Sequence, residues 1–455
     1  MIDRIENPER RIFGTEMEYM VKNNLTQTGG FSYWELNGGL TYPDGYGLEC
    51  ATPETAGIAE ATIYTHVSDL LIAKSTNSQR IHRRIRGHSE GGEPTIRGFH
   101  INLEVTATTS RAKIAEQLGT FITACMIING AGWADRTGLL LEDTVMFGTS
   151  QRGSAITDVI TKLAHQAHKP WIIDRDENHN GDSEDTFRLQ ITADPNINPR
   201  ATATTLGLFS IGLRLCENGI YPKYFYQEVI PAAKKISHSR FGNVALQTNN
   251  GMLYPTDVIE DLLNQAMKHQ DLLADDEREM LPELIDQVQR YRRDPMLLWR
   301  EIDHVTKTYI AEQKGLTKPM DLAALDLNYD CLRGMNTETG QGVGYRFHEE
   351  GHFANQLSKD DLEKASQSPP NTRAFYRTWL HLLLKSLKVE HCVEWSQITT
   401  TQPISRTLTL SNARGIITPE EQNTIRNFII NDIAKLGSTV IKNRSSPEQI
   451  SLCES

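Results

Sequence analysis

The sequence predicts an α+β protein with a large main domain and a small C-terminal domain. Residues 11–21 alternate between apolar and polar side chains, as in a half-buried strand. Residues 255–315 instead repeat apolar side chains at helical spacing and carry many charges. From about residue 389 the pattern changes to short strand-like segments. We therefore expect the main domain over residues 1–388 and the small domain over residues 389–455.

The remaining elements follow from the same two periodicities. Helical spacing recurs in the segments 55–80, 112–132, 201–216, 373–388 and 419–436. Strand-like alternation occurs in 98–105, at both ends of 171–194, and in the short segments VEWSQITTT and RTLTL after residue 389. Residues 37–50 predict a strand that enters an irregular, glycine-rich turn.

Composition excludes several classes of protein. The chain has 455 residues, of which 38% are hydrophobic and 23% charged, and this allows a large core. Its net charge of -11 argues against general nucleic-acid binding, which depends on clustered Lys and Arg. No run of about 18 apolar residues predicts a membrane span. The polar N-terminus lacks the apolar core of a signal peptide, and the six cysteines form no CxxC pair, so we expect a cytoplasmic protein.

The first expected strand carries two acidic residues, Glu16 and Glu18. Residues two apart on a strand point to the same face, so their carboxylates would lie side by side. They would repel each other unless a cation lies between them, and oxygen ligands of this kind suit Mg²⁺. A solvated strand face paired with Lys or Arg is the better explanation of such a pair taken alone.

The glycine-rich segment YPDGYGLECATPE concentrates further oxygen ligands. It holds Tyr42, Asp44, Glu49 and Glu54, and an irregular turn can aim several oxygens at one point. An ordinary surface loop is the alternative, because Asp and Gly are common there.

Two more segments add polar side chains. In GFHINLEV, His100, Asn102 and Glu104 share one face of a strand, where they suit a phosphate, a metal ion or a hydrogen-bonded core. Arg175 and Arg188 flank the polar loop. Arginine suits bidentate phosphate contacts, although a salt-bridged surface loop also explains them.

None of these signals is specific alone, but their order along the chain is. The sequence SQR follows at residues 150–152, KPWIIDRDENH at 169–179, ALDLNYDCLR at 324–333, PPNTRA at 369–374 and VEWSQI at 393–398. This collinear series, over roughly residues 11 to 430, resembles the Pup ligase and depupylase family. The resemblance implies a curved antiparallel sheet of the glutamine-synthetase-like type, flanked by helices, which cradles ATP.

The resemblance also implies roles for individual residues. Asp44 matches the catalytic aspartate. The expected magnesium ligands are Glu16, Tyr42 and Glu49, with Glu18 as a further candidate. Thr52 and Trp395 match positions that contact ATP, and further positions in the cofactor site are matched by His100, Asn102, Arg175 and Arg188.

The implied function is an ATP- and magnesium-dependent carboxylate–amine ligase. Such an enzyme would activate the C-terminal glutamate of a small acidic protein tag or peptide as an acyl phosphate and join it to a lysine of a target protein. A deamidase or isopeptidase acting on the same tag, a ligase for a peptide or small molecule, and an inactive binding protein are the alternatives. The short connection over residues 20–36 favours ligation, whereas the motif GTEMEY resembles the depupylase version.

Two departures from the family pattern concern charge. Leu40 stands where the family has an arginine near ATP. A basic run, formed by Arg80, His82, Arg83, Arg84, Arg86 and His88, would attract an acidic tag. A solvated helix end balanced by Glu90 and Glu93 explains this run equally well.

Overall fold

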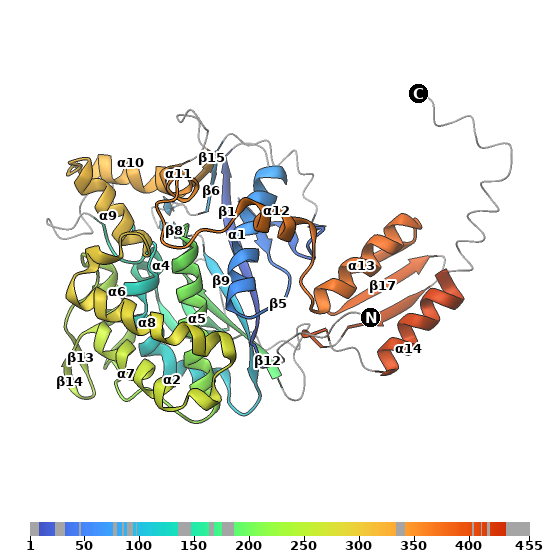
Figure 1. The fold of residues 1–455 in the computed structure, drawn as a ribbon, viewed down its shortest axis with the longest axis horizontal. Helices are drawn as coiled ribbons and strands as arrows, with labels where there is room; N and C mark the ends of the chain where they lie inside the picture. The colour runs from blue at the N-terminus through green and yellow to red at the C-terminus, as the bar shows by residue number, and fades with distance from the viewer. Residues whose placement is uncertain are drawn as a thin grey trace.

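The computed structural model describes residues 9–22, 32–44, 47–75, 80–83, 86–88, 94–96, 98–134, 147–162, 168–174, 186–333, 342–402, 405–410, 412–415 and 419–433. The chain forms a main domain around one large sheet, and a smaller C-terminal unit lies to one side of it (Figure 1). The predicted α+β class is confirmed. No helix among the described residues has the length and apolar character needed to cross a membrane.

The central sheet has 11 strands within the described residues. Its main path runs through β10 (Asp158–Thr161), β11 (Pro170–Ile173), β12 (Thr186–Ala193), β9 (Phe99–Thr106), β1 (Ile12–Lys22), β4 (Gly47–Ala51), β3 (Leu40–Asp44) and β2 (Tyr33–Trp34). Outside this path, β5 (Thr55–Ala56) and β6 (Arg80–His82) pair with β1, and β15 (Cys331–Arg333) pairs with β6. Among the described pairs, β10 and β11 are parallel and the others antiparallel, so the predicted antiparallel sheet holds except at this edge.

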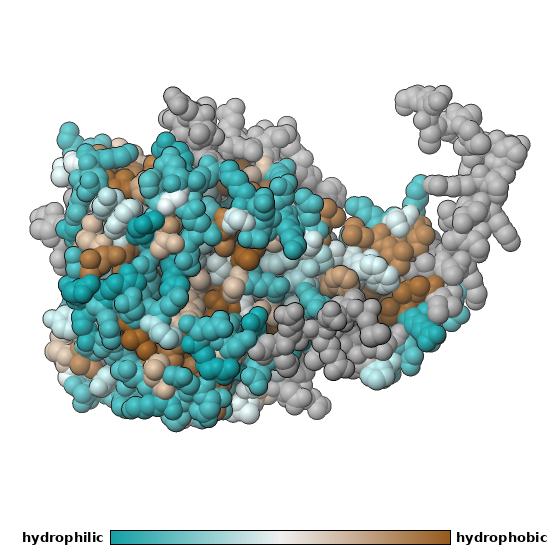
Figure 2. All heavy atoms as spheres, in the orientation of Figure 1, coloured by the Kyte–Doolittle hydropathy of each residue, from teal (hydrophilic) through white to brown (hydrophobic). Residues whose placement is uncertain are grey.

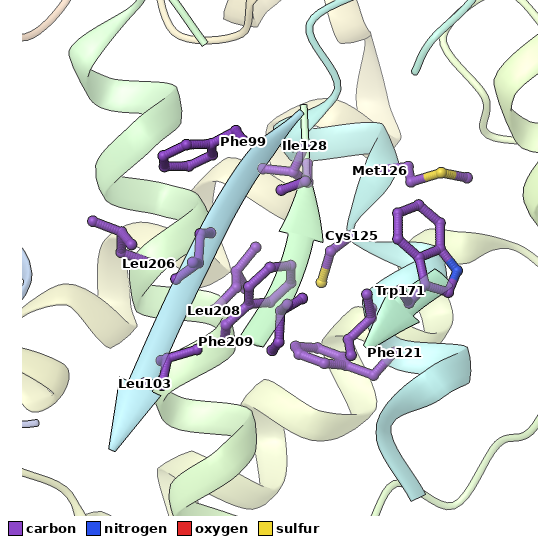
Figure 3. Packing of buried hydrophobic residues seen from close by; sticks show 14 of the residues in the cluster. Phe99, Leu103, Phe121, Cys125, Met126, Ile128, Trp171, Leu206, Leu208 and Phe209 are labelled. Carbon is purple, nitrogen blue, oxygen red and sulfur yellow. The ribbon is translucent and has the colours of Figure 1, made fainter. Parts of the chain in front are cut away.

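The two faces of the sheet differ because the strands alternate. On β1, Phe13, Met17 and Tyr19 are buried, while Glu16 and Glu18 between them are only partly covered. The apolar face packs against α1 (Ile58–Ser75), α2 (Arg111–Ala124) and α5 (Pro199–Glu217). Figure 3 shows Phe99 and Leu103 of β9 beside Leu206 of α5 in this core. The opposite face is left to polar side chains.

A second layer of helices covers α2 and α5. The predicted helical stretch 255–315 is divided into α7 (Pro255–Lys268), α8 (Asp275–Arg293) and α9 (Asp303–Gln313). Pro295 explains one break, because the residue before a proline disfavours the helical conformation and α8 ends there. The other helices of this domain are α3 (Met126–Asn129), α4 (Gln151–Ala155), α6 (Val229–His238), α10 (Pro319–Tyr329), α11 (Val343–Glu349) and α12 (Lys359–Gln367), and its small hairpins are β7 (Arg86–His88) with β8 (Pro94–Ile96) and β13 (Leu246–Thr248) with β14 (Gly251–Leu253).

Arg83, a member of the predicted basic run, is part of the core. Its side chain is 0% exposed and donates to Asp69 at 2.8 and 2.6 Å. Tyr19 and Tyr345 donate to the same carboxylate. Because Arg83 is buried, it does not belong to a basic surface groove. The segment also contains the strands β6 and β7, so it is not a solvated helix end. The side chains of Arg80, Arg84, Arg86 and His88 lie outside the described residues.

The C-terminal unit combines α13 (Arg373–Ser386), the antiparallel strands β16 (Glu390–Val393), β17 (Gln397–Gln402) and β18 (Arg406–Thr409), and α14 (Pro419–Asn427), which continues into a π-helical turn at Phe428–Ile433. It has its own hydrophobic cluster, which includes Leu380, Leu384, Ile398, Leu408 and Phe428. This cluster draws on α13, which precedes the domain boundary expected at residue 389. Residues 394–396 lie between β16 and β17, so the expected strand 393–401 is interrupted.

The surface of the C-terminal unit is partly apolar. Figure 2 shows hydrophobic patches on the face of this unit that is turned to the viewer. Among the large hydrophobic residues of α13, Trp379 and Leu382 are exposed.

Candidate functional site

The polar face of the sheet brings together acidic side chains from three strands. The pairing of β3 with β4 sets Tyr42 opposite Glu49, and the pairing of β4 with β1 sets Glu49 opposite Glu18. On the other side of β1, Glu16 faces His100 of β9. We call this surface the carboxylate face; it carries Glu16, Glu18, Tyr42, Asp44, Glu49, His100 and Asn102. The structure therefore unites seven of the predicted site residues.

Glu16 is held by three side chains, two from the adjacent strand β9 and one from β12 beyond it. Its carboxylate accepts hydrogen bonds from Asn102 Nδ2 at 3.0 Å and from Gln190 Nε2 at 2.8 Å, and His100 Nδ1 lies 3.2 Å away. Burial alone would raise the pKa of Glu16. The contact with His100, the charge of Arg188 and the bond from Asn102 overcome this and hold the pKa at about 2. Glu16 is thus a fixed, ionised carboxylate.

Glu18 occupies the next position on the same face. Its carboxylate accepts a hydrogen bond of 3.0 Å from the backbone N–H of Gly98, and His100 Nε2 lies 3.7 Å away. A Cβ atom at position 98 would lie 3.0 Å from His100 Nε2, so glycine leaves room for this close approach. His100 therefore stands between the carboxylates of Glu16 and Glu18.

Glu49 shows the opposite electrostatics. Burial, followed by the negative charges of Glu16 and Glu18, raises its pKa well above the ordinary value of 4.5. The pKa of the neighbouring Tyr42 phenol is also raised, first by burial and then by the charges of Glu49 and Glu16. Several carboxylates within one half-buried surface are unfavourable unless a cation compensates their charge.

The ligand atoms of this face form two overlapping groups. One contains Glu16, Glu49 and His100, and the other contains Glu18, Asp44 and Glu49. Within each group the ligand atoms lie within 4.8 Å of one another. Carboxylate oxygens predominate, which suits a hard divalent cation such as Mg²⁺. The face therefore offers two overlapping sets of candidate ligands for a divalent cation, and Glu49 belongs to both.

Three other predicted site residues are described, two in the central sheet and one in the C-terminal unit. Arg188 of β12 is opposite Glu104 of β9, close enough to Glu16 to affect its pKa. Thr52 is buried at the end of β4, and its hydroxyl accepts a bond of 2.8 Å from the backbone of Thr15. Trp395 lies between β16 and β17, with its ring 5.0 Å from that of Trp34. Arg175 lies outside the described residues.

Sequence reasoning did not identify Gln190 or the true place of Glu54. Gln190 stands two residues after Arg188 on an alternating strand, and this spacing is the signal that could have placed it on the same face. Glu54 is grouped with Asp44 and Glu49 by sequence, but it contacts Arg373 and Arg377 of α13 instead. It joins the sheet to the C-terminal unit.

Comparison with known proteins gives concordant matches. The model of the Pup-ligase protein family matches residues 4–399. The chain is 22% identical to the Pup–protein ligase of Kocuria rhizophila, over 92% of this chain and 99% of the relative. It is 25% identical to the depupylase of Acidothermus cellulolyticus, over 75% and 70% of the two chains.

Two solved structures share the fold. The complex between prokaryotic ubiquitin-like protein Pup and its ligase PafA superposes with a TM-score of 0.77 and 18% identity, covering 99% of both chains. The Pup ligase PafA in complex with ADP gives a TM-score of 0.73 and 19% identity, covering 88% of this chain and 91% of that one.

Proposed function

This chain belongs to the Pup-ligase protein family, and we propose that it is an ATP- and magnesium-dependent ligase that joins a carboxylate to an amine. The family contains both Pup–protein ligases and depupylases. The observation that carries the proposal is the pair of ligand groups on the carboxylate face, which share Glu49. A face of this kind suits the metal-bound phosphates of a nucleotide.

The residues of the carboxylate face would hold magnesium. Glu16, Glu18 and Glu49 supply the carboxylates, with Tyr42 beside Glu49 as a further ligand. When bound, magnesium would neutralise the charge of the ATP phosphates during transfer. Asn102 and Gln190 fix the carboxylate of Glu16 in advance, so little reorganisation is needed on binding.

The nucleotide would lie over the sheet and reach the C-terminal unit. We assign contacts with ATP to Trp395, Thr52, His100, Asn102, Arg188 and Arg175. A relative of the same fold was solved with ADP, which supports the use of ATP. Arg188, on the polar face of β12, is our candidate for a phosphate contact.

The substrates are proposed to be a tag and a lysine. An oxygen of a C-terminal glutamate carboxylate attacks the γ-phosphorus of ATP, ADP leaves, and an acyl phosphate results. The lysine amine then attacks the carbonyl carbon and phosphate leaves. A free lysine has a pKa of about 10.4 and is protonated at neutral pH, so a base must take its proton. We assign this role to Asp44, which lies beside Glu18 and Glu49.

The relative solved with Pup supports a small protein as the tag, and we propose that the tag is acidic and that the targets are lysine-bearing proteins.

Deamidation or isopeptide cleavage of the same tag is the second candidate. The match to a depupylase favours it. The connection between β1 and β2 favours ligation. It runs only from Lys22 to Tyr33, whereas the family pattern places a long loop there in depupylases.

Mass spectrometry separates these activities. The purified chain would be incubated with Mg-ATP, acidic peptides ending in Glu or Gln, and a lysine donor, with Asp44→Asn as the matched control. A new amide on the Glu peptide with one ADP per bond supports the ligase. Conversion of the Gln peptide to Glu without net ATP turnover would establish the second candidate instead. No change in either peptide would rule out a tail of this kind as substrate.

A further inference from the structure

A buried ion cluster joins the central sheet to the C-terminal unit. Glu54, 8% exposed, follows β4 and accepts bonds from two arginines of α13, Arg373 at 2.6 Å and Arg377 at 2.8 Å. Burial would raise the pKa of Glu54, but the charges of Arg377 and Arg373 hold it at about 2. Removing such charges from water is costly, and a buried pair is weak evidence for stability. A geometrical role is the better explanation.

The two arginines make different contacts. Besides Glu54, Arg373 donates to the carbonyl of Leu410 at 3.2 Å. Arg377, 1% exposed, donates to the carbonyl of Trp395 at 2.7 Å and to that of Gly38 at 2.9 Å. Arg377 therefore links the sheet to the chain segment that carries Trp395, whereas the backbone contact of Arg373 is with Leu410, beyond β18.

Arg377 also contacts the ring of Trp395. Its guanidinium carbon lies 4.8 Å from the centre of that ring and 4.7 Å from the centre of the Trp34 ring. The two indoles meet edge to face at 5.0 Å. A planar cation that contacts two aromatic rings at once restricts their orientation, and a lysine cannot reproduce these contacts together with the forked bonds to Glu54.

The sheet is shaped to receive this contact. Gly38 has a φ of +83°, and a Cβ atom there would lie 2.7 Å from Thr378 Oγ1. Only glycine allows α13 to approach the turn between β2 and β3 so closely. Trp34 of β2 donates from Nε1 to the carbonyl of Val393 at 3.2 Å, next to the segment of Trp395. Ring and backbone of this segment are thus both tied to the sheet.

We propose that Arg377 is a positioning residue that sets the place of Trp395 in the nucleotide site, by tying its ring and carbonyl to Glu54 and Gly38. This inference rests on the proposed function, in which Trp395 contacts ATP. It adds that Arg377 fixes the position of Trp395 relative to the central sheet. An aromatic ring serves the base of a nucleotide, so Arg377 acts on the binding of the base and not of the phosphates.

The test compares Arg377→Lys with Arg373→Lys in the full chain. Both remove one forked bond to Glu54, but only the first removes the contacts with Trp395. Dissociation constants are measured in Mg²⁺ for ATP and for inorganic tripolyphosphate, which has no base. Stacking on an aromatic side chain accounts for a large part of base binding. We therefore expect R377K to raise the dissociation constant of ATP about tenfold and that of tripolyphosphate less than twofold. R373K should change both ligands equally.

Equal effects of R377K and R373K on ATP, with equal losses in melting temperature, would overturn the inference and leave the proposed function standing. Failure of the unmodified chain to bind ATP would overturn both. If R377K does not fold, Trp34→Leu, which removes the other ring stacked on Arg377, replaces it. This variant should raise the dissociation constant of ATP more than that of tripolyphosphate, and an equal effect on both would count against the inference.

Discussion

Glu18 and Glu49 face each other across the pairing of β1 with β4, on the polar side of the sheet. Glu16 on β1 and Asp44 on β3 complete a group of four carboxyl side chains around them. The fold therefore concentrates negative charge on the polar face of the sheet. The apolar side chains of the opposite face cannot neutralise this charge. We interpret this concentration as the reason why the face needs a divalent cation.

Glu49→Gln should separate stability from metal binding. The folded-state pKa of Glu49 is raised, so its contribution to stability is lost as pH rises through that pKa. In EDTA at neutral pH the variant should therefore be more stable than the unmodified chain, because a buried, unfavourable negative charge is removed. Mg²⁺ should stabilise the unmodified chain but not the variant. Urea unfolding measures both, with Glu116→Gln, an exposed residue of α2, as the control.

A less stable Glu49→Gln variant in EDTA that still gains stability from Mg²⁺ would contradict this interpretation of the carboxylate face.

Glu54 predicts a pH window of the opposite sign. Its pKa is lowered from the ordinary value of 4.5 to about 2, so the contribution is complete above about pH 4.5 and is lost as pH falls towards 2. That contribution is on the order of 3 kcal/mol. Glu54→Gln should cost about 3–5 kcal/mol at pH 6, because two buried arginines lose their partner. Its unfolding free energy should then fall less steeply than that of the unmodified chain between pH 5 and 3, as measured by urea titration. Parallel pH curves for the two proteins would refute the assignment.

Gln190→Leu should weaken magnesium binding without removing a ligand. Gln190 donates to Glu16 and is itself buried, and side chains that orient a ligand typically affect metal affinity by about 10–100-fold. Isothermal titration with Mg²⁺ in the presence of ATP gives the affinity, and the melting temperature in EDTA shows whether the fold persists. Unchanged affinity would mean that Asn102 and His100 suffice to hold Glu16.

Asp44→Asn tests the assigned base. Proton transfer by a positioned side chain is worth about 10²–10⁴-fold in rate, so amide formation should fall by that order. The dissociation constant of Mg-ATP should stay within about threefold, since Glu16, Glu18 and Glu49 remain. A large rise in this constant with a small loss of rate would instead make Asp44 a metal ligand.

The sequence predicts local structure well where one periodicity dominates. The alternation around Glu16 and Glu18 identified β1, and that of residues 98–105 identified β9, because one face of each strand is buried. The helical stretch 255–315 was harder, since helix breaks depend on a few residues such as Pro295. The hairpin around Trp395 was missed because the strands on both sides of it are short.

Long-range contacts explain the errors in the site. Glu54 lies five residues after Glu49, yet it stands in the connection between β4 and β5, and its partners are on α13, more than 300 residues later. Arg83 is basic in sequence but pairs with Asp69 in the core. The polar side chain of Gln190 does not indicate a role by itself, because its contact with Glu16 depends on the pairing of β12 with β9. Such partners are decided by tertiary packing, which no local pattern records.

The central claim is that the carboxylate face activates a carboxylate at the expense of ATP. An acidic peptide whose C-terminal glutamate α- and γ-carboxylates carry ¹⁸O would be incubated with the chain, Mg-ATP and a lysine donor, and the released phosphate analysed by mass spectrometry. We expect one ¹⁸O atom in phosphate for each amide formed, because the attacking oxygen leaves with the phosphoryl group. Amide formation with phosphate free of ¹⁸O, or ATP cleavage that never depends on the peptide, would contradict the claim.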